Sequence, residues 1–193
     1  MTASALREKL HRLADSEKAV GLQRFFKTGK GEYAEGDRFI GVRVPEIRKL
    51  VKAHPDTSLK DIKSLLHSTI HEERLLALLL MVQQYQRGDS ALRHTFYTLY
   101  LASTAFINNW DLVDVTAEHI VGAWLYTRSR KPLYKLARSK SLWERRIAIM
   151  ATFHFIKQGE FDETLMIAEV LLNDQHDLIH KAGGWMLREV GKR

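Results

Sequence analysis

Four similar amphipathic segments, at residues 72–84, 110–125, 143–157 and 177–190, constrain the fold of this chain more than any other feature. Within them apolar residues recur at the i, i+3, i+4, i+7 spacing of a buried helical face, and strand-like alternation is almost absent. When the segments are aligned on Ala77, Thr116, Ala148 and Gly183, they follow one another at intervals of 39, 32 and 35 residues. The pattern predicts an all-α protein in which Ala148 and Gly183 lie between stacked helices.

Short polar connections join these segments to further helical stretches, so that helices form pairs with a repeat of roughly 30–40 residues. This period is typical of α-solenoids of the HEAT or armadillo class, whose inner helices line a concave surface. We therefore predict a right-handed α-solenoid of HEAT-like repeats with a concave basic groove, folded as a single domain over residues 1–193. The predicted helices are 4–14, 17–27, 45–53, 58–66, 71–87, 90–103, 110–126, 131–138, 142–157, 161–172 and 176–190.

Residues 28–44 interrupt this pattern with a glycine-rich stretch that is too long for a simple helix connection. Pro45 then fits the first turn of a helix, where the backbone N–H groups have no partner within the helix. Such a helix start, flanked by Arg43 and Arg48, could bind a phosphate. An ordinary connecting loop is the alternative.

The composition narrows the class of protein. The chain has no cysteine, which excludes a disulfide framework, a cysteine zinc site and a thiol nucleophile. It carries 30 lysines and arginines against 23 acidic residues, a net charge of +7, which favours a polyanionic partner such as nucleic acid. It has neither an apolar leader nor an apolar run long enough to span a bilayer, so we expect a cytoplasmic protein that does not bind membranes.

One carboxylate stands out among the aligned segments. The residue two positions before the small residue differs among the four segments, which have Leu75, Asp114, Arg146 and Lys181 there in turn. Asp114 is thus an acid in a row that otherwise holds an apolar residue and two cations. Trp110 lies four residues before Asp114 on the same predicted helical face. Trp185 and Arg188 follow Lys181 at spacings that again keep them on one face.

A carboxylate in a basic groove weakens the binding of phosphates, unless it meets a positive charge on the substrate. Hydrolysis of an N-glycosidic bond generates such a charge, because the sugar becomes oxocarbenium-like. Indole faces also attract cations. Two alternatives remain open at this point: Asp114 could simply pair with Arg146 and fix two helices, and each tryptophan could be a core residue.

Three motifs in order resemble a known family. They are similar to the bacterial DNA alkylation-repair glycosylases of the AlkD type, which are built from HEAT-like repeats. The three motifs are Trp110-Asp111-Leu112-Val113-Asp114, Trp143-Glu144-Arg145-Arg146-Ile147-Ala148 and Gly184-Trp185-Met186-Leu187-Arg188-Glu189. The resemblance extends to Arg24-Phe25-Phe26-Lys27 and to residues 41–48.

This resemblance implies excision of positively charged N3- and N7-alkylated purines from duplex DNA, by hydrolysis and without base flipping. It implies that Asp114 is the catalytic carboxylate, assisted by Trp110 and Trp185. The residues it implies for DNA binding are cations and one aromatic: Arg145, Arg146, Lys181, Arg188, Phe25, Lys27, Arg43 and Arg48. No cofactor or metal is expected, since His176 and His180 lack a third ligand, and we expect a monomer.

The chain departs from the family pattern in two places. Phe25 stands where relatives carry a tyrosine, and the chain ends at Arg193 where relatives continue with another helical pair. We therefore expect a domain that lacks this C-terminal pair. Two other functions stay open: a non-catalytic HEAT-repeat module that binds damaged or branched DNA, and a solenoid whose groove binds an acidic peptide.

Overall fold

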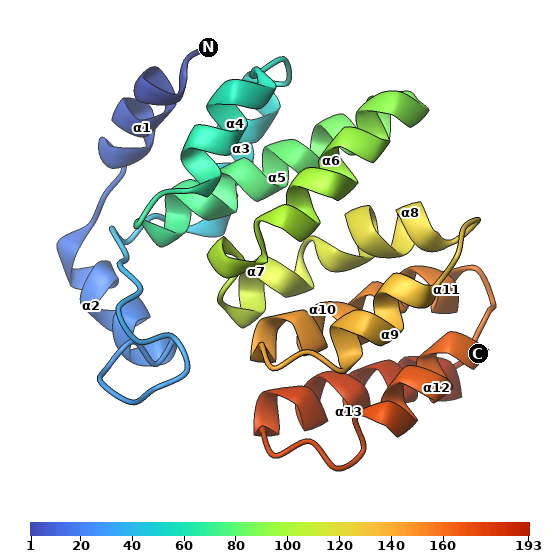
Figure 1. Ribbon diagram of the computed structural model, residues 1–193. Coiled ribbons are helices and arrows are strands. Elements are labelled where there is room, and N and C mark those ends of the chain that lie inside the picture. The colour runs from blue at the N-terminus through green and yellow to red at the C-terminus, as the bar shows by residue number, and fades with distance from the viewer. The chain divides into compact units, whose positions relative to one another are not determined.

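Helices make up nearly all of the regular structure in the computed structural model, which describes residues 1–193 (Figure 1). There is no β-strand; an isolated parallel bridge joins Arg38 to Ile70. The all-α prediction is therefore confirmed. No helix is both long enough and apolar enough to cross a membrane.

The chain divides into two compact units that alternate along the sequence. The first unit contains Met1–Arg87 and Ala105–Leu112, and the second contains Gly88–Thr104 and Val113–Arg193. The predicted single domain spans both, and a right-handed solenoid with one continuous groove stays a prediction. Two short elements, the 3-10 turn η1 (Thr104–Phe106) and α7 (Trp110–Asp114), contain residues of both units.

The first unit contains five helices. Their starts follow local chemistry, because Thr2, Asp15 and Ser58 each accept a hydrogen bond from a backbone N–H in the first turn of the helix that they cap. The long helix α5 contacts α3 and α4, and α1 packs on the same pair. The elements are α1 (Ala3–His11), α2 (Ser16–Phe25), α3 (Val44–Ala53), α4 (Leu59–Leu66) and α5 (His71–Arg87).

The predicted loop between α2 and α3 is confirmed as non-helical and is fastened at its C-terminal end. The Glu72 carboxylate, almost fully buried, accepts hydrogen bonds from the backbone N–H groups of Ile40, Gly41 and Val42. Gly41 has φ of 85°, and a Cβ there would lie 2.0 Å from the carbonyl oxygen of Asp15. Only glycine therefore allows the loop to approach α2 this closely.

The second unit is a two-layer array of helices. In one layer, α6, α9 and α12 each pack on a partner in the other layer, which contains the π-helical segment η2 together with α8, α10, α11 and α13. The elements are α6 (Ser90–Ala102), η2 (Glu118–Gly122), α8 (Ala123–Leu125), α9 (Lys131–Ala137), α10 (Leu142–Ala151), α11 (Phe153–Lys157), α12 (Asp162–Val170) and α13 (Asp177–Gly191).

Two long helices predicted from the sequence are interrupted in this unit. The predicted helix 110–126 consists of α7, a turn, the π-helical η2 and α8. The predicted helix 142–157 is divided at Thr152, whose hydroxyl donates to the Ile149 carbonyl oxygen at 2.7 Å. Such a side-chain bond to the preceding turn is known to bend helices.

The small residues used to align the segments do not all lie at helix contacts. Ala148 is fully buried, but a Cβ added to Gly183 would meet no atom within 4 Å, so the prediction that Gly183 lies between stacked helices is wrong. The neighbouring Ala182 is the buried residue of that turn. The close approach occurs instead at Gly122, where an added Cβ would lie 2.1 Å from the Ala151 carbonyl oxygen.

Candidate functional site

In the second unit, Asp114 and Arg146 form a bidentate ion pair. Nε of Arg146 donates to Oδ1 of Asp114 at 2.8 Å, and Nη2 donates to Oδ2 at 2.8 Å. The side chains are 14% exposed for Asp114 and 6% exposed for Arg146. This fork-to-carboxylate geometry fixes both the position and the plane of the carboxylate.

The predicted phosphate contact requires Arg146 to present its charge to solvent. In the structure the side chain does not do so. Its remaining terminal nitrogen, Nη1, donates to the carbonyl oxygen of Leu178 at the start of α13. The guanidinium therefore joins α7, α10 and α13 and holds Asp114. We correct its role from phosphate binding to positioning.

A buried hydrogen bond lies in the same part of the unit. The Tyr100 hydroxyl and Thr116 Oγ1 are 2.8 Å apart, and both residues are fully buried. Burial, together with the negative charge of Asp114, raises the pKa of Tyr100. Tyr100 therefore stays neutral near Asp114.

The other residues predicted in this unit have different environments. The Trp185 ring is half-buried and lies against Phe153, with ring centroids 5.9 Å apart. Lys181 and Arg188 are exposed on α13, and Lys181 pairs with Asp177 at 2.7 Å. These three side chains stay accessible to a ligand.

Arg145 is a second correction. Its Nε donates to Asp174 at 2.6 Å, and Nη1 donates to the carbonyl oxygens of Ser139 and Lys140. The pair is largely buried, with 19% of the Arg145 side chain and 7% of the Asp174 side chain exposed. Arg145 therefore stabilises the connections that precede α10 and α13, and its guanidinium is not available as a predicted DNA contact.

In the first unit, Trp110 belongs to an aromatic cluster. Its ring stacks on Phe26 with a centroid distance of 5.1 Å and meets the edge of Phe25 at 5.9 Å. Phe26 in turn stacks on Phe39 at 4.9 Å. Phe25 itself is 63% exposed, so it offers a free aromatic surface beside Trp110.

A cleft of about 570 Å³ opens beside this cluster, within the first unit. Phe25 and Arg43, both predicted DNA contacts, line it together with residues of α2, of α3 and of the loop. Arg48 is exposed on α3, and Lys27 is exposed just after α2, where it adopts a left-handed backbone conformation with φ of 55°. All four therefore lie at the surface of one unit.

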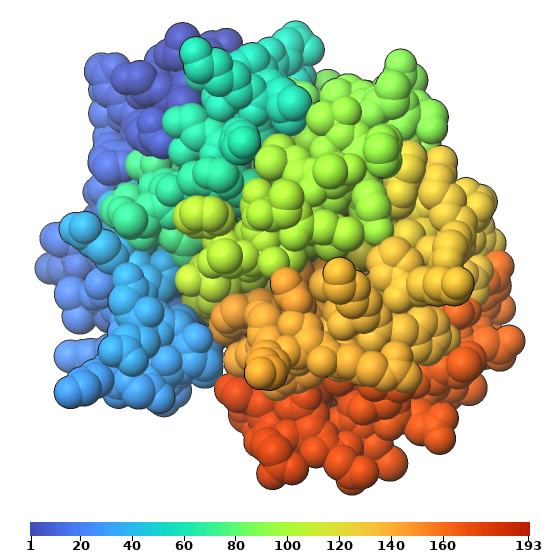
Figure 2. All heavy atoms as spheres, in the orientation of Figure 1, coloured from blue at the N-terminus to red at the C-terminus, as the bar shows by residue number.

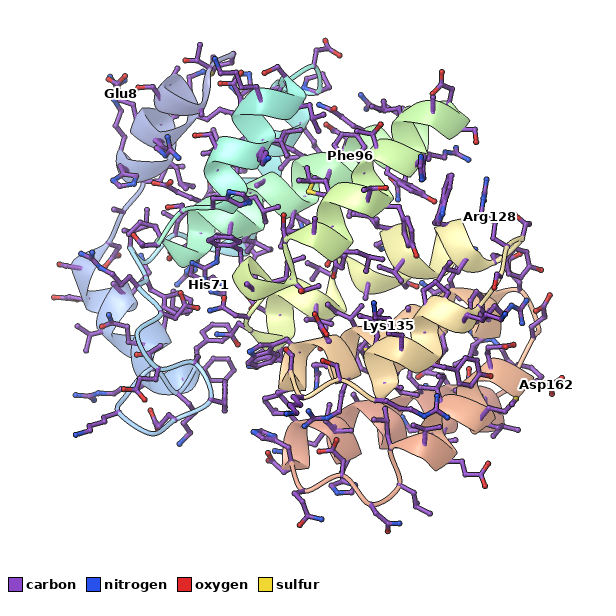
Figure 3. The ribbon with its side chains drawn as sticks, viewed as in Figure 1. Glu8, His71, Phe96, Arg128, Lys135 and Asp162 are labelled. Atoms are coloured by element: carbon purple, nitrogen blue, oxygen red, sulfur yellow. The ribbon has the colours of Figure 1, made fainter.

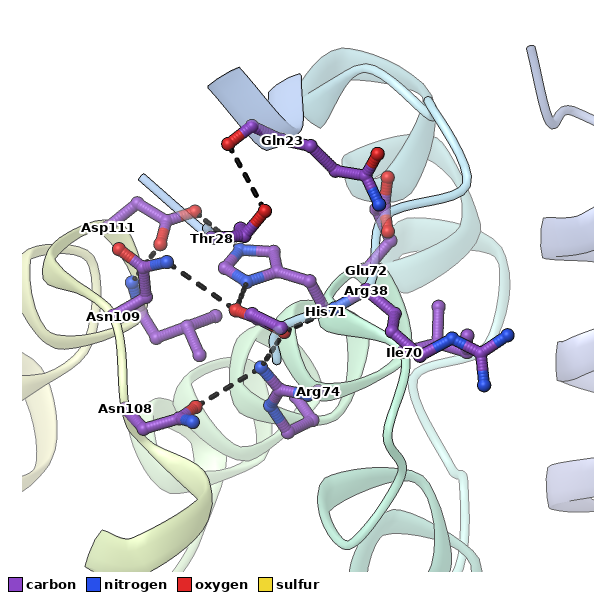
Figure 4. A network of polar contacts seen from close by, with 12 residues as sticks. Gln23, Thr28, Arg38, Ile70, His71, Glu72, Arg74, Asn108, Asn109 and Asp111 are labelled. Carbon is purple, nitrogen blue, oxygen red and sulfur yellow. Dashed lines mark hydrogen bonds and ion pairs between the residues drawn. The ribbon is translucent and has the colours of Figure 1, made fainter. Parts of the chain in front are cut away.

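A buried charged network behind the cluster was missed by the sequence analysis (Figure 4). His71 donates from Nδ1 to Asp37 and from Nε2 to Asp111, each at 2.8 Å. Arg74 adds a 2.7 Å contact to the other oxygen of Asp37, and the Asn109 side-chain amide contacts Asp37 at 3.4 Å.

The charge state of this network follows from its geometry. Burial alone would lower the pKa of His71, but the charges and hydrogen bonds of Asp111 and Asp37 outweigh burial and raise the pKa to about 9. Burial alone would raise the pKa of Asp37, but the bonds to His71 and Arg74 outweigh burial and lower the pKa of this aspartate. Near neutral pH, His71 is therefore protonated between the two aspartates, and its ring stacks on Phe39 of the aromatic cluster with centroids 4.2 Å apart.

No three histidine or acidic side chains are arranged to hold a metal ion. His180, considered in the sequence as a metal ligand, contacts the carbonyl oxygen of Asp174 at 2.6 Å. Nδ1 of His176 accepts from the Leu178 backbone N–H at 3.2 Å. Both histidines thus have structural contacts at the start of α13.

Comparison with known proteins identifies the family. Residues 6–193 match the sequence model of the family described as DNA alkylation repair enzyme. No curated protein is similar enough to match. Among solved structures, a "Predicted DNA alkylation repair enzyme from Enterococcus faecalis" is similar with a TM-score of 0.66 and 20% identity, over 93% of this chain and 84% of that one. At this identity the solved structure shows a shared fold, and the family match covers nearly the whole sequence. The chain therefore belongs to the DNA alkylation repair enzyme family.

Proposed function

We propose that this protein is a DNA glycosylase that removes positively charged N3- and N7-alkylated purines from duplex DNA, by hydrolysis and without flipping the base. The observation that carries the proposal is the Asp114 carboxylate, which Arg146 holds in one orientation through two 2.8 Å hydrogen bonds. The family match supports DNA as the substrate.

The proposed chemistry requires one carboxylate. As the N-glycosidic bond breaks, its electron pair passes to the alkylated base, which leaves as a neutral molecule, and positive charge develops on the sugar. The Asp114 carboxylate stabilises that charge, while a water molecule adds its oxygen to C1′ and loses a proton. Because the alkylated base is already cationic, it needs no proton from the protein.

Three accessible side chains of the same unit suit such a substrate. Trp185 offers an indole face, which attracts cations by roughly 0.5–2 kcal/mol. Arg188 and Lys181 offer exposed positive charge for phosphates. In the first unit, Trp110, Phe25, Arg43, Arg48 and Lys27 are candidate DNA contacts, and a hydroxyl is missing at Phe25.

The Asp114–Arg146 pair also supports a second candidate function. A carboxylate that is fully engaged by a guanidinium can be a purely structural bridge between helices. The protein would then be a non-catalytic module that binds damaged or branched DNA, held in shape by this pair.

Release of base from methylated DNA separates the two candidates. The wild-type protein should release 7-methylguanine or 3-methyladenine faster than the spontaneous rate, as quantified by chromatography. Asp114→Asn should slow release at least about tenfold, which corresponds to about 1.4 kcal/mol, and should leave DNA binding unchanged or tighter.

Asp177→Asn is the matched control, because Asp177 is an exposed carboxylate of the same unit that also pairs with a cation. It should release base at the wild-type rate. Absence of release by a folded wild-type protein would reject the glycosylase and leave the DNA-binding module. Equal rates for Asp114→Asn and wild type would reject Asp114 as the catalytic carboxylate.

A further inference from the structure

The segment from Arg128 to Trp143 concentrates positive charge more than any other part of the chain. It contains six lysines and arginines and no acidic residue. Two of these cations are engaged: Arg130 pairs with Glu160 and Glu163, and the Arg128 guanidinium lies 3.6 Å from the ring centroid of Trp124. The other four are Lys131, Lys135, Arg138 and Lys140, of which Arg138 also contacts Tyr134, with its guanidinium 5.9 Å from the ring centroid and Nη1 donating to the carbonyl oxygen at 3.4 Å.

These four side chains are exposed, and none of them forms an ion pair with a carboxylate. With Tyr134 and Ser139, three of them border a shallow hollow of about 660 Å³ on the surface of α9. The Glu144 carboxylate also borders the hollow, and it accepts a hydrogen bond from Thr104 Oγ1 at 2.8 Å. Figure 2 shows α9, in gold, at the surface on the face in view, and Figure 3 labels Lys135 there.

Lys131 and Lys135 lie on one face of α9 at the i and i+4 positions, and Arg138, the residue that caps the C-terminal end of α9, follows at i+7. Like charges at these spacings destabilise a helix by a few tenths of a kcal/mol per pair, and α9 itself contains no acid that compensates for them. An anionic ligand would relieve this repulsion.

The spacing of the three cations favours a particular anion. Seven residues of α-helix extend over about 10 Å. Neighbouring cations in this row are about 5–6 Å apart, and their long side chains can reach successive phosphates of one winding DNA strand. A row of phosphates therefore matches the row of cations in both length and charge.

This surface lies on a different layer from Asp114. α9 belongs to the layer of α6 and α12, whereas Arg146 and Trp185 lie on α10 and α13 of the opposite layer, where Arg146 holds Asp114. We propose that the cationic face of α9 binds the phosphate backbone of duplex DNA at a segment other than the one that meets Asp114.

The test is the salt dependence of binding to undamaged duplex DNA. The triple variant Lys131→Gln, Lys135→Gln, Arg138→Gln should reduce the slope of log affinity against log salt by about two to three, because each phosphate contact contributes about 0.9. The control variant Lys52→Gln, Lys60→Gln, Lys63→Gln removes the same charge from exposed positions of α3 and α4, and should change the slope much less. Circular dichroism checks that both variants are folded.

Three results would overturn the proposal. The first is a slope for the α9 variant equal to that of the control. The second is a lower rate of base release at saturating protein, which would place this surface at the reacting DNA segment. The third is loss of polyglutamate binding with an unchanged DNA slope, which would assign the surface to an acidic protein partner. The slope is measured on undamaged DNA, so it decides the proposal even if the protein releases no base.

Discussion

Asp114 and Arg146, 32 residues apart in the sequence, are joined by two parallel hydrogen bonds of 2.8 Å. The pair combines the two alternatives that the sequence left open. It is a bridge between helices, and it also holds one carboxylate in a fixed orientation. The contribution of this pair to the stability of the protein and its effect on DNA binding can be measured separately.

Arg146→Gln should destabilise the protein by about 3 kcal/mol, because it leaves a largely buried carboxylate without its cation. It should not change the salt slope of DNA binding, since the guanidinium is not exposed to phosphates. Urea unfolding and a salt titration provide the two measurements.

Arg188→Gln is the counterpart of that variant, because Arg188 is exposed on α13. It should reduce the salt slope by about one unit and change stability by less than about 0.5 kcal/mol. An Arg146 variant that behaved like this one would show that Arg146 does bind phosphate.

Two glycines of the second unit should respond in opposite directions to alanine. Gly122→Ala places a Cβ 2.1 Å from the Ala151 carbonyl oxygen and should lower stability by about 1–3 kcal/mol. Gly183→Ala meets nothing within 4 Å and lies inside α13, so it should raise stability by up to about 1 kcal/mol. Thermal melts of both variants provide the comparison, and equal shifts would contradict the packing seen at Gly122.

Stability should fall as the pH rises through the titration of His71. Its pKa is about 9 in the folded protein against 6.5 for the unfolded group, so its stabilising effect is complete below pH 6.5 and is lost as the pH rises through 9. The loss is on the order of 3 kcal/mol.

His71→Gln removes the titrating group and keeps a donor, so it provides the control for this effect. The variant should be less stable than wild type at pH 6, and the difference between the two should shrink toward pH 10. A difference that stays constant over this range would mean that His71 is not protonated in the folded protein.

Phe25→Tyr introduces the tyrosine that the resemblance to the AlkD-type glycosylases implies at this position. Phe25 is 63% exposed, so the added hydroxyl reaches solvent and should change stability by less than about 0.5 kcal/mol. If this position contacts DNA, the hydroxyl should tighten binding by about 1 kcal/mol, roughly fivefold. Phe161→Tyr, a half-buried position of the second unit, should not alter binding.

Local signals in the sequence predicted most helix positions. The predicted helix 71–87 coincides with α5, and the predicted start of the helix at Pro45 lies within one residue of that of α3. Caps, proline and apolar spacing act within a few residues, so a single sequence carries them.

The sequence contains a weak signal for the interruption of the helix that was predicted over 110–126. Val113, Ala117, Val121 and Leu125 are buried at a strict four-residue period, whereas an α-helix repeats every 3.6 residues. A wider turn keeps such residues on one face, and the chain forms the π-helical η2 there.

The side-chain roles were harder to predict, because they depend on partners far along the chain. Arg145 and Arg146 are adjacent cations, and nothing local reveals that Asp174 and Asp114 engage them. His71 similarly depends on Asp37 and Asp111, which lie 34 and 40 residues away. A pattern of charge shows that cations exist but not which of them remain free for DNA.

The alternation of the two units along the sequence has a consequence for synthesis on the ribosome. The first unit is completed by Ala105–Leu112, whose Asn109 and Asp111 join the network of Asp37 and His71. These residues emerge only after Gly88–Thr104, the first segment of the second unit. Domains generally fold as units from the N-terminus during synthesis. The first unit therefore cannot complete the pairing of its buried charges until the first segment of the second unit has already emerged.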